Sequence, residues 1–558
     1  MTATAELLSA LLPLFAVIPL LLAGVVAILP WAPARAALGI LTPAAMAIGA
    51  FAMLGYVTAN EPVGHGVGAF PGGVAIPFVA DGFSLLMLGV ASLVVFVASW
   101  FAQVVGENES RFFSSLTLMM SSGMAGAFLT ADLFNFFVFM EVMLLPSYGL
   151  IAVTGTWHRL AAGRSFVLVN LLTSTVLLIG VALTYGSVGS VNIALLAGVA
   201  AGGGPGTVAL GLVVIALGVK AGLAPVHTWL PRTYPSTSPA VMALFSAVHT
   251  KVAVYMMFRV YVVIVDMEPS WHWPIIALMA VSMLIGAFAG LAEDTMRRVL
   301  AYQMVNGMPF ILVVLAFTDG DARAALAAGI FYAVHHMITV GSLIMASGAI
   351  EETYGTGILS RLSGLARRDP LVAWVFAAMA FSIVGFPPFS GLWGKVGVVF
   401  AAAGTGDARS IVVISVIVLA SMGALLSMVR VWRAVFWGRD MKGVDAGLRV
   451  PKRMVWPSAV LALGSFGMFI FAAPVSTAAG AAADSLLDVP AYVEAALGDP
   501  EAAVAFGRLD NVSPEVGEPG TGAGDPDNGA ENAGDGAGAD SATDTGTDST
   551  AETEGTDN

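Results

Sequence analysis

A small set of ionisable side chains lies inside long apolar stretches of this 558-residue chain. The set has one acid and four bases: Glu141, Lys220, Lys251, Arg259 and Lys395. Charged side chains at membrane depth are costly, so each is a candidate functional residue. A buried lysine loads and releases a proton readily near neutral pH. These residue types in this setting predict a path for protons or Na⁺.

Glu141 and Lys220 are the clearest pair. Large apolar residues flank Glu141 on both sides, so its carboxylate needs a cationic partner or a proton. With Lys220 it would form a proton-binding element whose affinity depends on the separation of the two groups. A purely structural ion pair is the alternative interpretation.

Four histidines in apolar segments are candidate relay groups, because imidazole titrates near physiological pH: His227, His249, His335 and His336. His227 and His249 are secondary candidates. His335 and His336 point about 100° apart on one helix, so they face different neighbours, and the sequence does not choose between them. A histidine that is simply hydrogen-bonded inside the core is the alternative interpretation.

Arg259, a further secondary candidate, has two interpretations. It either lines the path or, near the end of its helix, only extends its long side chain to the interface. Asp81 and Asp132 stand at predicted helix starts, where N-capping alone explains them.

Prolines interrupt two apolar stretches beside the lysines. Pro225 follows Lys220, whereas Pro387 and Pro388 precede Lys395. Proline removes a helical hydrogen bond, and broken membrane helices are tolerated where they line a polar cavity. The order of proline and lysine is reversed between the two stretches, and so is their direction through the membrane. This reversal is what inverted repeats produce.

The composition places these residues in lipid. Apolar residues make up 58% of the chain and charged residues 11%, whereas soluble domains have about 25% charged residues. Mean hydropathy is +0.86. We predict an all-α polytopic membrane protein with about 14 transmembrane helices, two inverted five-helix repeats (helices 4–8 and 9–13) and broken helices 7 and 12. The predicted spans lie near residues 6–29, 35–58, 82–105, 112–130, 133–153, 164–186, 206–230, 239–265, 272–292, 299–318, 322–348, 370–400, 408–438 and 454–474.

Loop charges predict the orientation. With the N-terminus outside, seventeen lysines and arginines of the loops and helix ends fall on the cytoplasmic side, and only Arg323 and Arg409 fall on the other. Cytoplasmic loops are enriched in these residues. We therefore predict a multi-pass protein of the bacterial cell membrane with both termini outside.

Five segments follow from this pattern. Residues 1–110 hold helices 1–3, residues 111–265 the first repeat and residues 266–440 the second. Residues 441–483 hold a cytoplasmic loop and helix 14. Residues 484–558 carry 18 of the 37 acidic residues and are predicted to form an acidic, largely disordered external tail.

Several kinds of site are excluded. The chain has no cysteine, which rules out disulfides, iron–sulfur ligation and cysteine-bound zinc. It also lacks a phosphate-binding loop and a basic nucleic-acid patch. We expect no catalytic residue, no metal, no cofactor and no nucleic-acid partner.

Four stretches resemble, in order, the motifs of the antiporter-like subunits shared by respiratory complex I and the Mrp multisubunit Na⁺/H⁺ antiporters. They are residues 219–231 (VKAGLAPVHTWLP), 239–251 (PAVMALFSAVHTK), 297–302 (RRVLAY) and 385–395 (GFPPFSGLWGK). Within the family, the chain looks most like the D-type subunits of the Mrp complexes, on residues 132–141 (DLFNFFVFME) and 147–150 (SYGL).

The resemblance implies four central ion-path residues and one bridging histidine: Glu141, Lys220, Lys251 and Lys395, with His335 or His336. Many relatives place a lysine four residues after the second histidine, where this chain has Val340. The relay in that half then uses histidine and water, or the path is altered there.

We therefore predict a secondary ion transporter and not an enzyme. It would be one subunit of a multisubunit cation/proton antiporter, with the other subunits, Na⁺, H⁺ and the lipid bilayer as its partners. A proton-pumping membrane subunit of a redox-driven complex, such as NADH–quinone oxidoreductase or a membrane-bound hydrogenase, is the alternative. A mainly structural subunit, whose charges hold helices together, is the third hypothesis.

Overall fold

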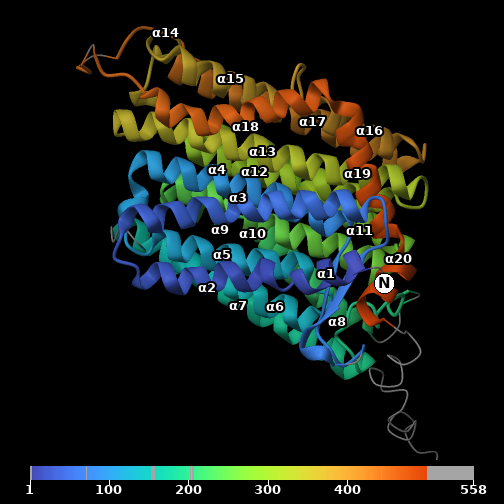
Figure 1. The fold of residues 1–558 in the computed structure, drawn as a ribbon. Coiled ribbons are helices and arrows are strands. Elements are labelled where there is room, and N and C mark those ends of the chain that lie inside the picture. The colour runs from blue at the N-terminus through green and yellow to red at the C-terminus, as the bar shows by residue number, and fades with distance from the viewer. Residues whose placement is uncertain are drawn as a thin grey trace, which may run out of the picture. The chain divides into compact units, whose positions relative to one another are not determined.

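The computed structural model describes residues 3–498, except residues 71, 153–156, 202, 204, 205, 442 and 446. This part of the chain is mostly helical, and its long helices run side by side (Figure 1). The helices are α1 (Ala3–Leu11), α2 (Leu14–Ile28), α3 (Ala32–Val57), α4 (Gly82–Val105), α5 (Phe113–Leu129), α6 (Leu133–Ala152), α7 (Trp157–Val188), α8 (Gly206–Ala221), α9 (Trp229–Thr233), α10 (Pro239–Arg259), α11 (His272–Ala289), α12 (Met296–Leu312), α13 (Ala322–Tyr354), α14 (Leu365–Arg368), α15 (Pro370–Val384), α16 (Gly391–Ala403), α17 (Ala408–Val431), α18 (Lys452–Ile470), α19 (Ala472–Leu487) and α20 (Val489–Leu497).

Eleven helical segments in the described part of the chain are long and apolar enough to cross a membrane. Four shorter apolar helices accompany them: α5, α8, α15 and α16. The prediction of an all-α polytopic membrane protein is confirmed. The count of fourteen crossings stays a prediction, because it requires the shorter helices to cross as well and α15 and α16 to form one broken crossing.

Both predicted helix breaks are present. Helix α8 ends at Ala221, one residue after Lys220, and helical structure resumes at Trp229. Helix α15 ends at Val384, and α16 begins at Gly391. Glycines with positive φ, Gly222 at 79° and Gly385 at 100°, turn the chain out of each helix in a conformation that other residues rarely adopt. Each break contains a cis prolyl bond, before Pro225 and before Pro388.

Two helices form the centre of the protein. The most apolar windows of α10 and α13 are completely buried inside the chain itself, unlike those of the outer helices. Helix α13 packs against α4, α10, α12, α15, α16 and α18. Its contact with α10 is close because Gly348 has no side chain: a Cβ there would lie 2.3 Å from Cβ of Pro239. Polar residues on α10 and α13 are therefore shielded from lipid.

The two ends of the helices differ. At the arginine-rich end, which carries Arg297, Arg361, Arg367, Arg368 and Arg439, the N–H of Gly364 donates to the carbonyl of Trp437 at 3.0 Å. At the opposite end, called here the α19 end, strands β1 (Val63–Gly66) and β2 (Pro77–Ala80) form an antiparallel hairpin against which α20 packs. Which end faces the cytoplasm stays a prediction.

The predicted start of the tail at residue 484 is wrong. Asp484 and Ser485 belong to α19, and α20 extends the helical part to Leu497. Asp484 forms an ion pair with Arg323 at 2.6 Å, and the hydroxyl of Ser485 accepts from the N–H of Gly82 at 3.0 Å. These contacts anchor residues that the acidic composition alone assigned to disorder. Residues 499–558 lie outside the described part.

Candidate ion-translocation site

Lys220 is held where α6, α7 and α8 meet. Its side chain is 3% exposed, and its ammonium group donates to the hydroxyl of Ser174 on α7 at 2.9 Å. Glu141 on α6 interacts with Lys220 electrostatically, but no direct ion pair joins them within the described residues. The Oε1 atom of Glu141 is buried and lacks a hydrogen-bond partner in the described part of the chain. The two groups therefore sense each other's charge without neutralising each other by contact.

His249 on α10 is the next buried polar group. Its Nε2 lies 2.7 Å from the hydroxyl of Ser147, and its Nδ1 lies 3.1 Å from the phenol oxygen of Tyr234. It also interacts electrostatically with Lys220. Both ring nitrogens thus have hydroxyl partners, and hydroxyl groups both donate and accept protons.

A second group of polar side chains lies between α10, α12 and α13. Lys251 on α10 is fully buried, and its ammonium group donates to the neighbouring hydroxyl of Thr250 at 3.2 Å. His336 on α13 interacts with it electrostatically. Both ring nitrogens of His336 and the side-chain amide of Gln303 are buried and have no side-chain hydrogen-bond partner within the described residues, although His336 interacts with the backbone of Gln303. Buried polar groups are almost always hydrogen-bonded, so these side chains are where we expect further polar partners such as water.

His335 takes part in a closed ring of buried hydrogen bonds, called here the hydroxyl ring. Its Nδ1 lies 2.8 Å from the hydroxyl of Ser390 and 3.2 Å from that of Thr339. Ser465 on α18 joins Ser390 at 2.8 Å and Ser382 at 2.9 Å, and Ser382 returns to Thr339 at 3.2 Å. The ring links α13, α15, α18 and the break before α16.

Lys395 on α16 uses groups that the break provides. Its ammonium group donates to the carbonyl of Val384 and to the hydroxyl of Ser421, both at 2.8 Å, and lies 4.9 Å from the centre of the Phe310 ring. The carbonyl of Val384 is available because α15 ends at that residue. Lys395 also interacts electrostatically with His335.

The two adjacent histidines of α13 therefore face different neighbours. His336 lies near Lys251, and His335 lies in the hydroxyl ring near Lys395. Which of the two bridges the predicted halves stays a prediction. Val340, which replaces a lysine of many relatives, is buried in this region.

The side chain of Arg259 is buried inside the protein. The interpretation that it extends to the membrane interface is therefore wrong. The side chain is 1% exposed and pairs with the buried carboxylate of Asp81 at 2.6 Å. The phenol ring of Tyr492 covers the guanidinium at 4.6 Å. Asp81 also caps α4 by accepting from the N–H of Ser84 at 2.7 Å, so N-capping is only half of its role. Asp132 caps α6 as predicted, through the N–H of Asn135 at 2.7 Å.

His227 lies in the break after α8 and is buried, so it does not face open water. Its Nδ1 has no hydrogen-bond partner in the described part of the chain. The structure does not bring it into contact with the other candidate histidines.

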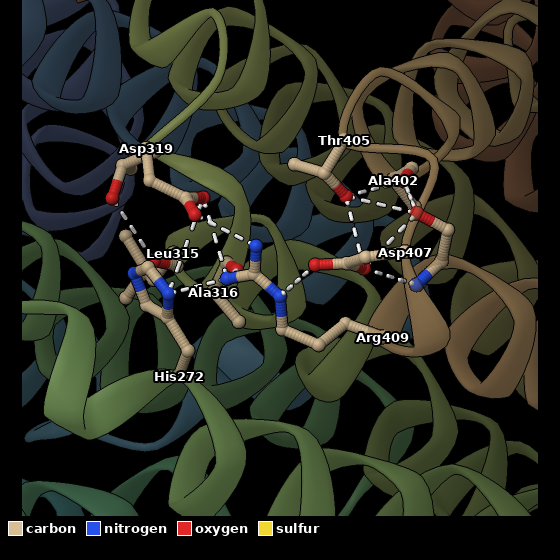
Figure 2. A network of polar contacts seen from close by, with 10 residues as sticks. His272, Leu315, Ala316, Asp319, Ala402, Thr405, Asp407 and Arg409 are labelled. Atoms are coloured by element: carbon tan, nitrogen blue, oxygen red, sulfur yellow. Dashed lines mark hydrogen bonds and ion pairs between the residues drawn. The ribbon is translucent and has the colours of Figure 1, made fainter.

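A polar cluster that sequence analysis did not identify lies at the α19 end (Figure 2). Arg409 at the start of α17 donates to Asp319 at 2.7 Å and to Asp407 at 2.6 Å, and it contacts His272 of α11. Partial burial alone would raise the pKa of each aspartate, but the hydrogen bonds and charge of Arg409 outweigh it and lower both pKa values. The cluster ties together the N-terminal ends of α11 and α17 and the turn before α13.

Comparison with known proteins places the chain in a family. The model for the family "NADH:quinone oxidoreductase/Mrp antiporter, TM" matches residues 130–423, which contain every buried lysine described above. A Bacillus subtilis protein, named as the D-type subunit of an Na⁺/H⁺ antiporter, is 32% identical over 438 residues, which cover 77% of this chain and 87% of that protein. The chain belongs to the NADH:quinone oxidoreductase/Mrp antiporter family.

Solved structures agree with the family assignment. A chain of the Mrp complex from Dietzia sp. DQ12-45-1b is 37% identical, with a TM-score of 0.84 that covers 88% of this chain and all of that chain. A chain of respiratory complex I from Thermus thermophilus is 24% identical with a TM-score of 0.68, covering 85% of this chain and 99% of that one. The second likeness shows a shared fold only.

Proposed function

We propose that this chain is a subunit of a multisubunit Na⁺/H⁺ antiporter and carries protons, Na⁺ or both along the row of buried groups from Glu141 to Lys395. The names of the Bacillus and Dietzia relatives support the antiporter complex. The observation that carries the proposed path is the group of Lys251, His336 and Gln303, where ionisable and polar side chains are buried together between α10, α12 and α13.

Charge coupling moves the ions in this proposal. A proton that arrives at Glu141 removes its negative charge and so favours proton release from Lys220. The loss of positive charge at Lys220 then changes the electrostatic potential at His249 and Lys251. Through the two histidines of α13, the same change reaches Lys395. Two unit charges about 8 Å apart interact by about 2 kcal/mol at an effective dielectric constant of about 20. Such an energy changes a proton affinity more than tenfold.

The membrane orientation is part of the same proposal. Because cytoplasmic loops are rich in arginine and lysine, the arginine-rich end faces the cytoplasm and the α19 end faces outside. The protein then spans the bacterial cell membrane with its N-terminus outside. The driving force comes from the existing ion gradients, without a bound cofactor.

Antiport in everted vesicles that contain the whole complex tests the path. Lys220→Ala and Glu141→Ala should abolish Na⁺-dependent proton movement while the complex still assembles. Lys452→Ala, which removes an exposed lysine at the start of α18, is the matched control and should keep full activity. Full antiport in the Lys220 and Glu141 variants would refute the proposed path.

A proton-pumping subunit of a redox-driven complex is the second candidate, supported by the complex I-like fold. Genes for iron–sulfur and flavin subunits beside this one would favour it, whereas genes for small hydrophobic subunits favour the antiporter. The purely structural hypothesis predicts that exchanging the charges of Glu141 and Lys220 leaves transport intact.

A further inference from the structure

A cluster of acids and bases at the arginine-rich end lies apart from the proposed ion path. It gathers where α4 and α13 end and where α10 and α12 begin. Its members are Glu107 in the turn after α4, Arg159 on α7, Ser238 before α10, Arg297 on α12, and Glu351 and Glu352 on α13. The central helices α10 and α13, which carry His249, Lys251, His335 and His336, thus both terminate at this cluster.

Glu107 is the most distinctive member. Its Oε2 accepts a hydrogen bond of 2.5 Å from the hydroxyl of Ser238, which also caps α10 through the N–H of Val241 at 3.2 Å. Burial raises the pKa of Glu107 above its usual range, although Ser238 and the charges of Arg159 and Arg297 oppose this rise. The carboxyl group is therefore able to take up a proton closer to neutral pH than an exposed glutamate.

The neighbouring carboxylates add to the negative charge around Glu107. Arg297 forms an ion pair with Glu351 at 2.7 Å and also donates to the carbonyl of Thr237 at 2.6 Å. Glu352 adds negative charge near Glu107. Three carboxylates thus lie close to two guanidinium groups. The negative charge of Glu352 favours the protonated form of Glu107, whereas the charges of Arg159 and Arg297 oppose it.

A cavity gives Glu107 access to water. Its volume is about 300 Å³, and its walls include Glu107, Ser110, Arg159 and Ser238. Because a water molecule occupies about 30 Å³ in the liquid, several fit. Polar side chains converge on this cavity from α7, from the turn after α4 and from the start of α10.

The segment that holds Ser238 also leads to the row of buried groups. The hydroxyl of Thr237 donates to the carbonyl of Tyr234 at 2.7 Å. The phenol oxygen of Tyr234 lies 3.1 Å from Nδ1 of His249. Residues 234–238 therefore contact Glu107 through Ser238 and His249 through Tyr234.

We propose that Glu107 and Ser238 form a proton-loading site at the arginine-rich end. The carboxylate of Glu107 takes a proton from a hydronium ion in the cavity, leaving water, and passes it toward Tyr234 and His249. This inference rests on the proposed function, because it supplies the row of buried groups with protons. Its ligand is the proton alone.

Glu107→Gln is the direct test, and Glu109→Gln is its matched control. Glu109 lies in the same short turn but is exposed, so its substitution changes the charge of the loop equally without altering the site. In vesicles with the whole complex, Glu107→Gln should slow Na⁺-dependent proton movement at least about tenfold, since positioned proton-transfer groups contribute about 10² or more. Glu109→Gln should stay within about twofold of the unchanged protein.

The pH profile separates proton loading from mere structural support. Glu107→Asp keeps a carboxyl group and should retain proton movement with a displaced pH dependence, and it decides the question if Glu107→Gln fails to assemble. Unchanged rates and pH profiles in both Glu107 variants, together with an inactive Lys220→Ala complex, would overturn the loading site and leave the proposed function standing. If Lys220→Ala is also fully active, the proposed function itself fails.

Discussion

Gly307 on α12 offers a sharp test of the group of polar side chains between α10, α12 and α13. A Cβ built on Gly307 would lie 1.9 Å from Nε2 and 2.1 Å from Cδ2 of His336, whereas ordinary contacts begin at 3.4 Å. In Gly307→Ala, the imidazole must therefore move by about 1.5 Å, the difference between 3.4 and 1.9 Å. A misplacement of about 1 Å in a reacting group is enough to cost about 10²-fold in rate.

The same substitution should leave the complex assembled. Alanine in a helix interior is favoured over glycine by up to about 1 kcal/mol, while overpacking a core costs about 1–3 kcal/mol. The net change is thus too small to unfold a protein of this size. Loss of antiport without loss of the complex is the result that identifies a displaced relay.

Vesicle antiport, with complex content measured on native gels, is the assay. Gly467→Ala on α18 is the matched control, because no atom lies within 4 Å of the added methyl group. We expect antiport to fall about 10²-fold in Gly307→Ala and to stay unchanged in Gly467→Ala. Equal, full antiport in both variants would show that the position of His336 does not matter for transport, and the relay assigned to it would have to be abandoned.

Three further predictions concern other parts of the structure. Arg259→Ala leaves the carboxylate of Asp81 buried and unpaired, so the purified complex should lose about 3–5 kcal/mol of stability in thermal unfolding. Neutralising both residues should recover part of this loss. A double variant with no recovery would contradict the buried ion pair. The two aspartates that Arg409 contacts have lowered pKa values. Their contribution to the free energy of unfolding is therefore complete above the unfolded pKa of about 3.9, and it is lost as the pH falls through their lower folded pKa values. Acid melting curves should show this step in the unchanged protein and not in Arg409→Gln; identical curves would argue against the cluster. Ser465→Ala opens the hydroxyl ring, so it should lower stability by about 1–3 kcal/mol and slow antiport. Ser465→Thr should restore both. If the Ser465→Ala variant is as stable and active as the unchanged protein, the ring contributes to neither stability nor transport.

The sequence was sufficient to predict the features that depend on local chemistry. Proline and glycine dictate backbone conformation wherever they occur, so the breaks beside Lys220 and Lys395 were predictable from Pro225 and from Pro387 and Pro388. Buried charges were predictable as well, because each one interrupts an otherwise apolar stretch of sequence. The path along these residues stays a prediction until transport is measured.

Features that depend on contacts between distant residues could not be predicted in this way. Arg259 and Asp81 are separated by 178 positions, and no local pattern indicates that they pair. Serine is common in membrane helices, so nothing marked Ser465 as a member of the hydroxyl ring. The acidic composition near residue 484 likewise concealed two helices, because their stability comes from docking onto other elements.

The consecutive positions of His335 and His336 have a mechanical consequence. Both rings hang from neighbouring Cα atoms, which a trans peptide holds about 3.8 Å apart. Sliding or tilting α13 therefore moves both rings together and cannot lengthen the step between them. The distance between the two rings therefore changes only by rotation about side-chain bonds. This motion is far faster than the rearrangement of whole helices. In the predicted arrangement of two repeats, the junction between them would be one residue wide.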